Sequence, residues 1–366
     1  MHPSVPPTPG PPARRAASTR VCSRPAARYH APMRTTPFAI VLAFAACTAA
    51  AVAQELDFEA AAAFSAENAG LAVLVYERGE LVFEQYQNGH AEDRPQHLFS
   101  GTKSFAPMVA LIACEEGLLD LDEPVADTIT EWRGDPRRER ITVRHLLQFT
   151  SGLEHIDRAL HSPRTRDTYA AAIACKGEHE PGARFRYGSN HLTVFGALLE
   201  RKLRAASTPE RPLPEDFVGY LDARVLDPIG CRFASWIRDA EGHPALPFGA
   251  HMTAREWAKF GLLVLGRGKW GERQVVPAER FDECFRGSEA NARYGLNFWL
   301  IGAGLHRREP AIPADTVSAA GMYDQRLYVV PSREVLVVRL GRTGARSRFG
   351  DFPFLQRLFA ATGDGR

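Results

Sequence analysis

Leu98-Phe-Ser-Gly-Thr-Lys-Ser-Phe105 begins a helical pattern that runs to Glu116 and ends at Gly117, a residue favoured just after a last helical turn. The stretch contains Ser100 and Lys103. Three-residue spacing on a helix places a hydroxyl and an amine on one face, within reach of each other. The first turn also presents free backbone N–H groups and the positive end of the helix dipole. A serine there suits chemistry that develops an oxyanion, with lysine as base if its pKa falls.

The tetrapeptide alone also fits a simpler interpretation, in which Ser100 caps a helix and Lys103 is solvated. The chain contains only five lysines, and this is its only serine followed three residues later by a lysine. The surrounding sequence therefore has to decide between the two interpretations.

Several segments resemble, in order, the class C-type serine β-lactamase and penicillin-binding-protein superfamily. Glu116-Gly-Leu-Leu-Asp-Leu-Asp-Glu-Pro-Val125 follows the serine, and Ile141-Thr-Val-Arg-His-Leu-Leu-Gln-Phe-Thr-Ser-Gly-Leu153 is similar to the next signature. Gly249-Ala-His-Met-Thr-Ala-Arg-Glu-Trp-Ala-Lys-Phe-Gly261 is similar to a later one. The resemblance runs from about residue 71 to 340 and is nearest to the esterase and nylon-oligomer-hydrolase branches.

The resemblance implies three catalytic residues. Ser100 is the expected nucleophile and Lys103 its partner, while Tyr187 in Phe185-Arg-Tyr-Gly-Ser-Asn190 is the expected shared base. Either Ser189 or Asn190 should take the polar position that faces the cleft.

A later segment, Ala319-Ala-Gly-Met322, resembles the strand that lines the cleft. Gly321 fits the family pattern, and the Met322 amide is the expected second oxyanion donor beside that of Ser100. The family has a basic residue where Ala319 stands, and its loss argues against β-lactams as the natural substrate. Arg326 or Arg342 could supply positive charge nearby.

Strand-like runs lie near both ends of the chain. Residues 71–86 and 326–340 each have a hairpin pattern, whereas the region between them is mostly helical. We therefore expect an α+β fold with an antiparallel sheet formed from both chain ends, flanked by helices, and with an inserted, mostly helical region. Residues 54–366 would form one hydrolase domain, with an α/β part at about 54–115 and 275–366 and a helical part at about 116–274.

Residues 1–53 are expected to be a disordered leader plus a signal peptide. Pro37 to Ala46 is apolar but too short to span a membrane, and Ala51-Val-Ala53 offers a cleavage site. This pattern predicts export to the periplasm or the medium, with Met33 as a possible true start. Lipoprotein anchoring at Cys47 and a flexible tail on a cytosolic protein are weaker alternatives.

The charge pattern does not indicate a nucleic-acid-binding protein. Six of the 45 basic residues precede residue 55, which leaves 39 basic against 43 acidic residues and no basic stripe. The cysteines at 114, 175, 231 and 284 have no zinc-ligand spacing, and whether they form disulfides stays open.

The expected function is therefore metal-independent cleavage of a small-molecule ester or amide through an acyl-enzyme on Ser100, without a cofactor and without a membrane span in the mature chain. A penicillin-recognising DD-peptidase or weak β-lactamase is one alternative. A non-catalytic binding protein on the same fold is the other.

Overall fold

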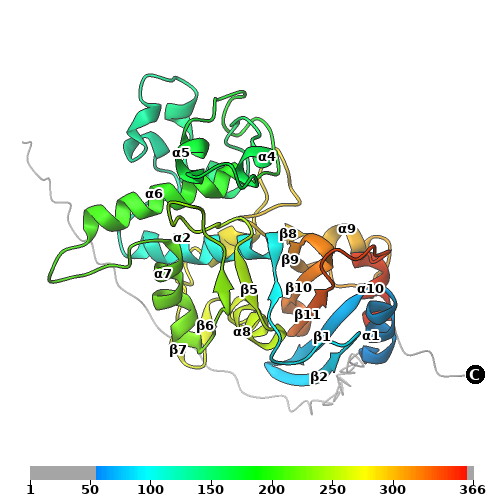
Figure 1. Ribbon diagram of the computed structural model, residues 1–366. Coiled ribbons are helices and arrows are strands. Elements are labelled where there is room, and N and C mark those ends of the chain that lie inside the picture. Colours follow the sequence, from blue (N-terminus) through cyan, green and yellow to red (C-terminus); the bar gives the residue numbers. More distant parts are fainter. Residues whose placement is uncertain (1–54, 361–366) are drawn as a thin grey trace, which may run out of the picture. The chain divides into compact units, whose positions relative to one another are not determined.

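The computed structural model describes residues 55–360, in which one sheet lies beside a helical region (Figure 1). The predicted leader, signal peptide and Cys47 lie outside these residues. Within them, the model contains no helix long and apolar enough to cross a membrane.

The sheet region and its short outlying ladders contain eleven strands among the described residues: β1 (Gly70–Glu77), β2 (Glu80–Tyr86), β3 (Gln96–His97), β4 (Ser235–Trp236), β5 (Ala250–Met252), β6 (Lys269–Trp270), β7 (Arg273–Gln274), β8 (Trp299–Leu300), β9 (Val317–Gly321), β10 (Gln325–Val330) and β11 (Val335–Gly341).

The α-helices in this part of the chain are α1 (Phe58–Glu67), α2 (Phe105–Glu115), α3 (Val143–Leu147), α4 (Asp157–Leu160), α5 (Thr168–Ile173), α6 (Asn190–Ala206), α7 (Phe217–Leu221), α8 (Ala254–Leu265), α9 (Gly302–His306) and α10 (Asp351–Phe359). Two short 3-10 helices matter for the site: η1 (Phe99–Ser104) and η8 (Met322–Asp324).

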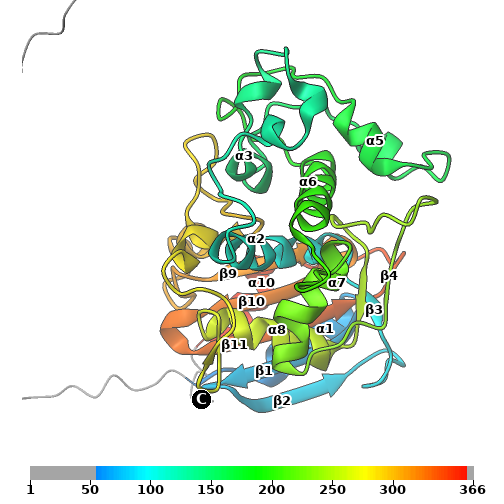
Figure 2. The ribbon, with the colours of Figure 1, turned by 90° about the vertical axis from the view of Figure 1, so that its left-hand side faces the viewer.

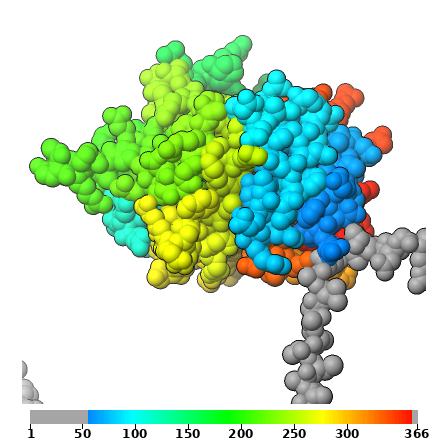
Figure 3. Space-filling view, turned by 90° about the horizontal axis from the view of Figure 1, so that it is seen from below, coloured from blue at the N-terminus to red at the C-terminus, as the bar shows by residue number. Residues whose placement is uncertain are grey.

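The main sheet has six antiparallel strands in the order β2-β1-β11-β10-β9-β8. The first and last long strands of the described chain are neighbours, with Val75 of β1 opposite Val337 of β11. Figure 3 shows early described residues, in blue, beside late ones, in orange and red, on one face of the molecule. The predicted α+β fold, with a sheet formed from both chain ends, is confirmed.

Both faces of the sheet are covered, which explains why β1 and β11 are mostly apolar, with the buried Arg339 as an exception in β11. Side chains alternate along a strand, so Leu74 and Val338 join one apolar cluster while Val75 and Val337 join another. The first cluster contains the apolar faces of α2 and α8, and the second contains those of α1 and α10. The sheet is thus the middle layer of a three-layer arrangement.

Helix α2 lies between the sheet and α6 in both ribbon views (Figures 1 and 2). It is buried at every position from Phe105 to Ala113, because it has apolar elements on both sides. This central position holds the segment that precedes it, η1, against the end of β9.

Local sequence signals place several elements as expected. Thr142 and Thr253 cap α3 and α8 with their side chains, and each accepts the backbone N–H three residues later. The hairpin between β1 and β2 turns at Arg78 and Gly79, which both have positive φ angles of 49° and 85°. Hairpin chemistry and helix caps are local, so the sequence identifies them.

Two predictions need correction or completion. The stretch from Ser100 is not the first turn of an α-helix, because η1 is a 3-10 helix and α2 begins at Phe105. The four described cysteines, at 114, 175, 231 and 284, are free thiols.

Candidate active site

Ser100 stands second in η1, immediately after a strained residue. Phe99 has a φ of 48°, in the left-handed region that a bulky side chain rarely adopts. Its ring is held between His97, at a centroid distance of 3.8 Å, and Tyr323, at 5.2 Å. These contacts fix the turn that presents the Ser100 hydroxyl, which is partly exposed.

Lys103 reaches Ser100 across one turn of η1. A 3-10 helix has three residues per turn, so residues three apart eclipse each other more closely than on an α-helix. The Lys103 Nζ donates hydrogen bonds to Ser100 Oγ at 2.9 Å and to the Pro247 carbonyl at 2.7 Å. Ser100 Oγ therefore accepts a hydrogen bond from Lys103, and η1 has no side-chain cap at its N-terminus. The helix-cap interpretation of the tetrapeptide is wrong.

The Lys103 side chain is buried, with 3% of the residue exposed. Burial disfavours the ammonium form and lowers the pKa of Lys103 to about 7, while the Asp157 carboxylate opposes this shift. Near neutral pH, a large share of Lys103 is consequently the free amine.

Tyr187 lies on the other side of the same hydroxyl. Its ring stacks on Trp299 at 5.5 Å and meets Phe149 edge-on at 5.3 Å, and Lys103 Nζ lies 5.1 Å from its centroid. Burial raises the pKa of Tyr187 to about 12, although a hydrogen bond with Ser100 opposes this. The phenol therefore keeps its proton at neutral pH, whereas the amine of Lys103 can accept one.

Gly321 ends β9 directly against the start of η1. A Cβ at residue 321 would lie 2.0 Å from the Leu98 carbonyl oxygen and 3.1 Å from the Gly101 nitrogen, so only glycine fits. Met322 follows as the first residue of η8, with its side chain 60% exposed. Ser100 and Met322 thus both stand in the first turn of a 3-10 helix, where amide N–H groups have no partner within the helix.

Ser189 and Asn190, the two candidates for the polar position, both pair with residues outside the Ser100–Lys103–Tyr187 group. Ser189 Oγ pairs with His161 Nε2 at 2.9 Å, and the Ser189 amide donates to Asp157 at 2.6 Å. Asn190 donates to the Glu154 carbonyl at 2.8 Å. The hydrogen bonds of Lys103 go to Ser100 and Pro247. The structure therefore brings Ser100, Lys103 and Tyr187 together, whereas the side chains of Ser189 and Asn190 bind residues behind this group.

Asp157 and His161 form that second layer, and sequence reasoning gave them no role. The His161 ring packs edge-on against Phe248, the neighbour of the residue whose carbonyl holds Lys103. Asp157 acts on Lys103 through its charge. The only sequence signal for Asp157 and His161 was their place in a polar stretch before the tyrosine motif. Their contacts with Lys103 and Ser189 join residues far apart in the sequence, so they could be identified only from the fold.

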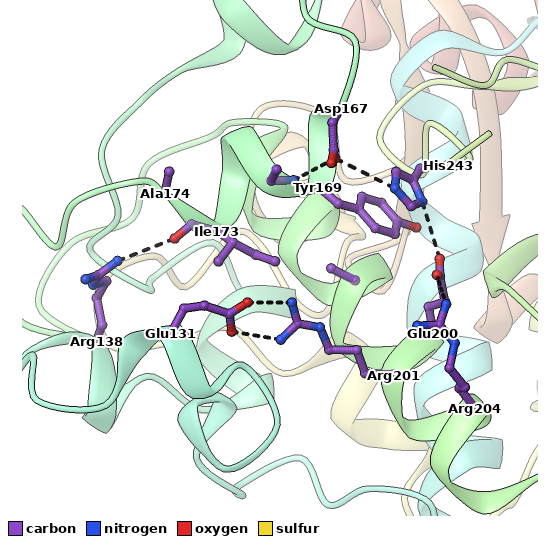
Figure 4. A pocket seen from close by; sticks show the side chains of 12 residues that line it. Glu131, Arg138, Asp167, Tyr169, Ile173, Ala174, Glu200, Arg201, Arg204 and His243 are labelled. Atoms are coloured by element: carbon purple, nitrogen blue, oxygen red, sulfur yellow. Dashed lines mark hydrogen bonds and ion pairs between the residues drawn. The ribbon is translucent and has the colours of Figure 1, made fainter. Parts of the chain in front are cut away.

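A different cavity, of about 590 Å³, lies among α5, α6 and the preceding loops (Figure 4). None of the three predicted catalytic residues lines it. Glu131 makes a two-pronged ion pair with Arg201, at 2.7 and 2.8 Å, and His243 lies between two carboxylates. Because the charged side chains that line it already have partners, we interpret this cavity as part of the structural framework and not as a binding site.

The sequence model of the Beta-lactamase family matches residues 49–357. A 6-aminohexanoate-dimer hydrolase of Paenarthrobacter ureafaciens is 24% identical over 303 residues, covering 74% of this chain and 71% of that protein. A monacolin J acid methylbutanoyltransferase of Aspergillus terreus is 31% identical over 166 residues, but the match covers 38% of this chain and only 37% of that relative's length.

The fold is also similar to the solved structure of a family VIII carboxylesterase. The TM-score is 0.63 at 18% identity, and the match covers 82% of this chain and 95% of that one. At this level of identity, the likeness concerns the fold.

Proposed function

The chain belongs to the Beta-lactamase family, whose members are serine hydrolases, and from this premise we propose that it cleaves an ester or amide through an acyl-enzyme on Ser100. The observation that carries the proposal is the contact of 2.9 Å between Lys103 Nζ and Ser100 Oγ, made by an amine whose pKa burial lowers to about 7. A nucleophilic serine needs an adjacent base that is unprotonated near working pH, and this pair supplies both parts.

Acylation begins when the neutral amine of Lys103 takes the Ser100 proton and Oγ attacks the substrate carbonyl. The amides of Ser100 and Met322 stabilise the negative charge that develops on the carbonyl oxygen. Tyr187, still a phenol, donates its proton to the leaving oxygen or nitrogen and regains one from the Lys103 ammonium. The resemblance implied Tyr187 as the shared base. We assign the first proton transfer to Lys103 instead, because the pKa of Lys103 is lowered whereas that of Tyr187 is raised.

Deacylation uses the same groups. Lys103, neutral again, accepts a proton from water as the water attacks the acyl-enzyme carbonyl, and that proton returns to Ser100 Oγ when the ester bond breaks. The acid is released and the starting protonation states are restored.

Covalent labelling tests the proposal directly. A fluorophosphonate probe should form one adduct, on Ser100, and the adduct should disappear in Ser100→Ala. Ser332→Ala, in the exposed turn between β10 and β11, is the matched control and should be labelled like the wild type. Labelling and ester turnover that persist in Ser100→Ala would end the proposal, and a wild-type chain that forms no adduct would favour the non-catalytic alternative.

The choice between an esterase or amidase and a penicillin-recognising peptidase or weak β-lactamase depends on the missing cation. Ala319 is buried on β9 where the resemblance led us to expect a basic residue. We therefore expect turnover of simple esters or amides and weak or no labelling by a fluorescent penicillin. Faster acylation by penicillins than by esters would reverse this order.

Acyl transfer to an alcohol is a second candidate outcome of the same acyl-enzyme. The relative from Aspergillus terreus is named a methylbutanoyltransferase, although its match covers a minor part of either chain. Adding a small alcohol during ester turnover distinguishes the two fates, because transfer gives a new ester whereas hydrolysis gives only the acid.

Export also belongs to the proposal and rests on residues 33–53 of the sequence. The full chain, expressed in a bacterial host, should be recovered outside the cytoplasm with its N-terminus near Gln54. Recovery of an uncleaved chain from the cytoplasm would contradict it.

A further inference from the structure

A cavity of about 580 Å³ lies at the open edge of the sheet, between β8 and α9. Both elements stand side by side in Figure 1, next to β9. Its inner wall is apolar, with Trp299, Leu300 and Leu305, and its rim has Arg293, Arg307 and Arg308. The cavity therefore combines an apolar interior with three positive charges.

No carboxylate of the described residues neutralises these charges. No Asp or Glu lines the cavity, and within residues 55–360 none of the three arginines forms an ion pair. The Arg308 guanidinium lies over the Phe352 ring, with Cζ 3.8 Å from the ring centroid, and this contact holds the group without cancelling its charge. The cavity in Figure 4 is the opposite case, since its arginines are bound to carboxylates.

Trp299 connects the cavity to the proposed catalytic residues. Trp299 forms part of its wall and stacks on Tyr187, at 5.5 Å and 22° between the ring planes, and Tyr187 is hydrogen-bonded to Ser100. In the sheet, Trp299 is opposite Ser318, one residue before Ala319. The ring of Trp299 thus separates the three arginines from Tyr187. The arginines lie on the side of β9 where Ala319 replaces the expected basic residue.

Neither arginine considered from the sequence can replace that residue. Arg326 is paired with Asp351 at 2.7 Å and donates to the Gly321 carbonyl at 3.1 Å, so its charge is neutralised within the protein. Arg342 lies beside the start of β1, where its guanidinium donates to the Asn88 carbonyl at 2.7 Å and is held by the protein.

We propose that this cavity is a substrate subsite for a carboxylate, which an apolar spacer separates from the ester or amide that Ser100 attacks. The arginines bind the carboxylate with charge-assisted hydrogen bonds, and Trp299, Leu300 and Leu305 cover the spacer. The subsite rests on the proposed hydrolase function and names its substrate class: half-esters or half-amides of dicarboxylic acids, and related acyl groups with a distal acid.

Two series of p-nitrophenyl esters test the subsite. One has acyl groups that end in a carboxylate, from glutarate to suberate, and the other has neutral acyl groups of equal length. The wild type should prefer the anionic series in kcat/KM by at least about tenfold for one spacer length, because two or three arginines then meet one carboxylate. Added salt should reduce this ratio, since the rim is exposed.

The double variant Arg293→Gln/Arg307→Gln should bring the ratio close to 1, and Arg307→Glu should favour the neutral series. Both residues are exposed and without ion-pair partners in the described chain, so folding should survive. Arg273→Gln, an equally exposed arginine on β7, is the control and should keep the wild-type ratio. A ratio near 1 in the wild type, or one that persists in the double variant, overturns the subsite.

Binding to Ser100→Ala separates a failed subsite from a failed hydrolase. Calorimetry should show that this variant binds the anionic ester more tightly than the neutral one, and that Arg293→Gln/Arg307→Gln removes the difference. That result would support the subsite even if no ester were turned over, whereas equal binding of the two esters would reject it.

Discussion

The protonation state of Lys103 gives the sharpest prediction. With a pKa of about 7, half of the amine is free at pH 7. At the ordinary pKa of about 10.4, the free fraction at pH 7 would be about 0.04%. Burial thus increases the proton-accepting form by a factor on the order of a thousand, and the proposed mechanism depends on that factor.

We therefore expect kcat/KM for ester hydrolysis to rise about tenfold per pH unit below the pKa of Lys103, and to level off above it. Release of p-nitrophenol should be followed from about pH 5 to pH 9 at constant ionic strength, with Ser100→Ala as the blank. Lys103→Arg should lose nearly all activity and also this rise of kcat/KM with pH, which is the acidic limb of the profile, because a guanidinium stays protonated.

A second variant checks the cause of the limb. The Asp157 carboxylate raises the pKa of Lys103, so Asp157→Asn should move the limb to lower pH, by about half a unit to one unit. A profile that is flat across neutral pH, or a limb that Asp157→Asn shifts upward, would refute the reasoning.

Four further predictions concern the rest of the site. Tyr187→Phe should keep the stacking on Trp299 but lower kcat by roughly 10²- to 10⁴-fold, with little change in KM, because no acid is left for the leaving group. Gly321→Ala should abolish activity and lower the Tm, since its Cβ would meet the Leu98 carbonyl at 2.0 Å. Lys103→Met should be inactive yet have a higher Tm than the wild type at pH 7, because folding of the wild type buries an amine and lowers its pKa. This difference in Tm should shrink as the pH rises toward about 10, where the lysine of the unfolded chain also loses its proton. Gln325→Met should lower kcat about tenfold and the unfolding free energy by about 2–3 kcal/mol, because Gln325 binds both the Met322 and Gly341 carbonyls, and activity and thermal melts would measure both effects.

The sequence was most informative where structure is local. Thr142 and Thr253 cap their helices, and Gly79 helps to turn its hairpin, because each effect involves residues within a few positions. The order of family-like segments identified the fold, and the same order brought Ser100, Lys103 and Tyr187 together.

What the sequence could not supply is contact between distant segments. Lys103 donates to the backbone carbonyl of Pro247. Because every residue has such a carbonyl, the residue type could not identify this acceptor. The polar position had two candidates, Ser189 and Asn190, and the sequence could not show that His161, from another loop, pairs with Ser189. The 3-10 geometry of η1 depends on its packing against β9, so the pattern alone predicted an α-helix.

The pairing of β1 with β11 has a consequence for biosynthesis. Val75 and Val337 are neighbours in the sheet but are made more than 260 residues apart, so these contacts have a high sequence separation and form late. Strand β9, which leads to the proposed oxyanion donor Met322, is also near the C-terminal end, so a nascent chain that lacks β9 has Ser100 but not the complete candidate site. A truncated chain ending before β9 should accordingly show no fluorophosphonate adduct, and under the proposed function activity would appear only after β9 has been translated and has folded.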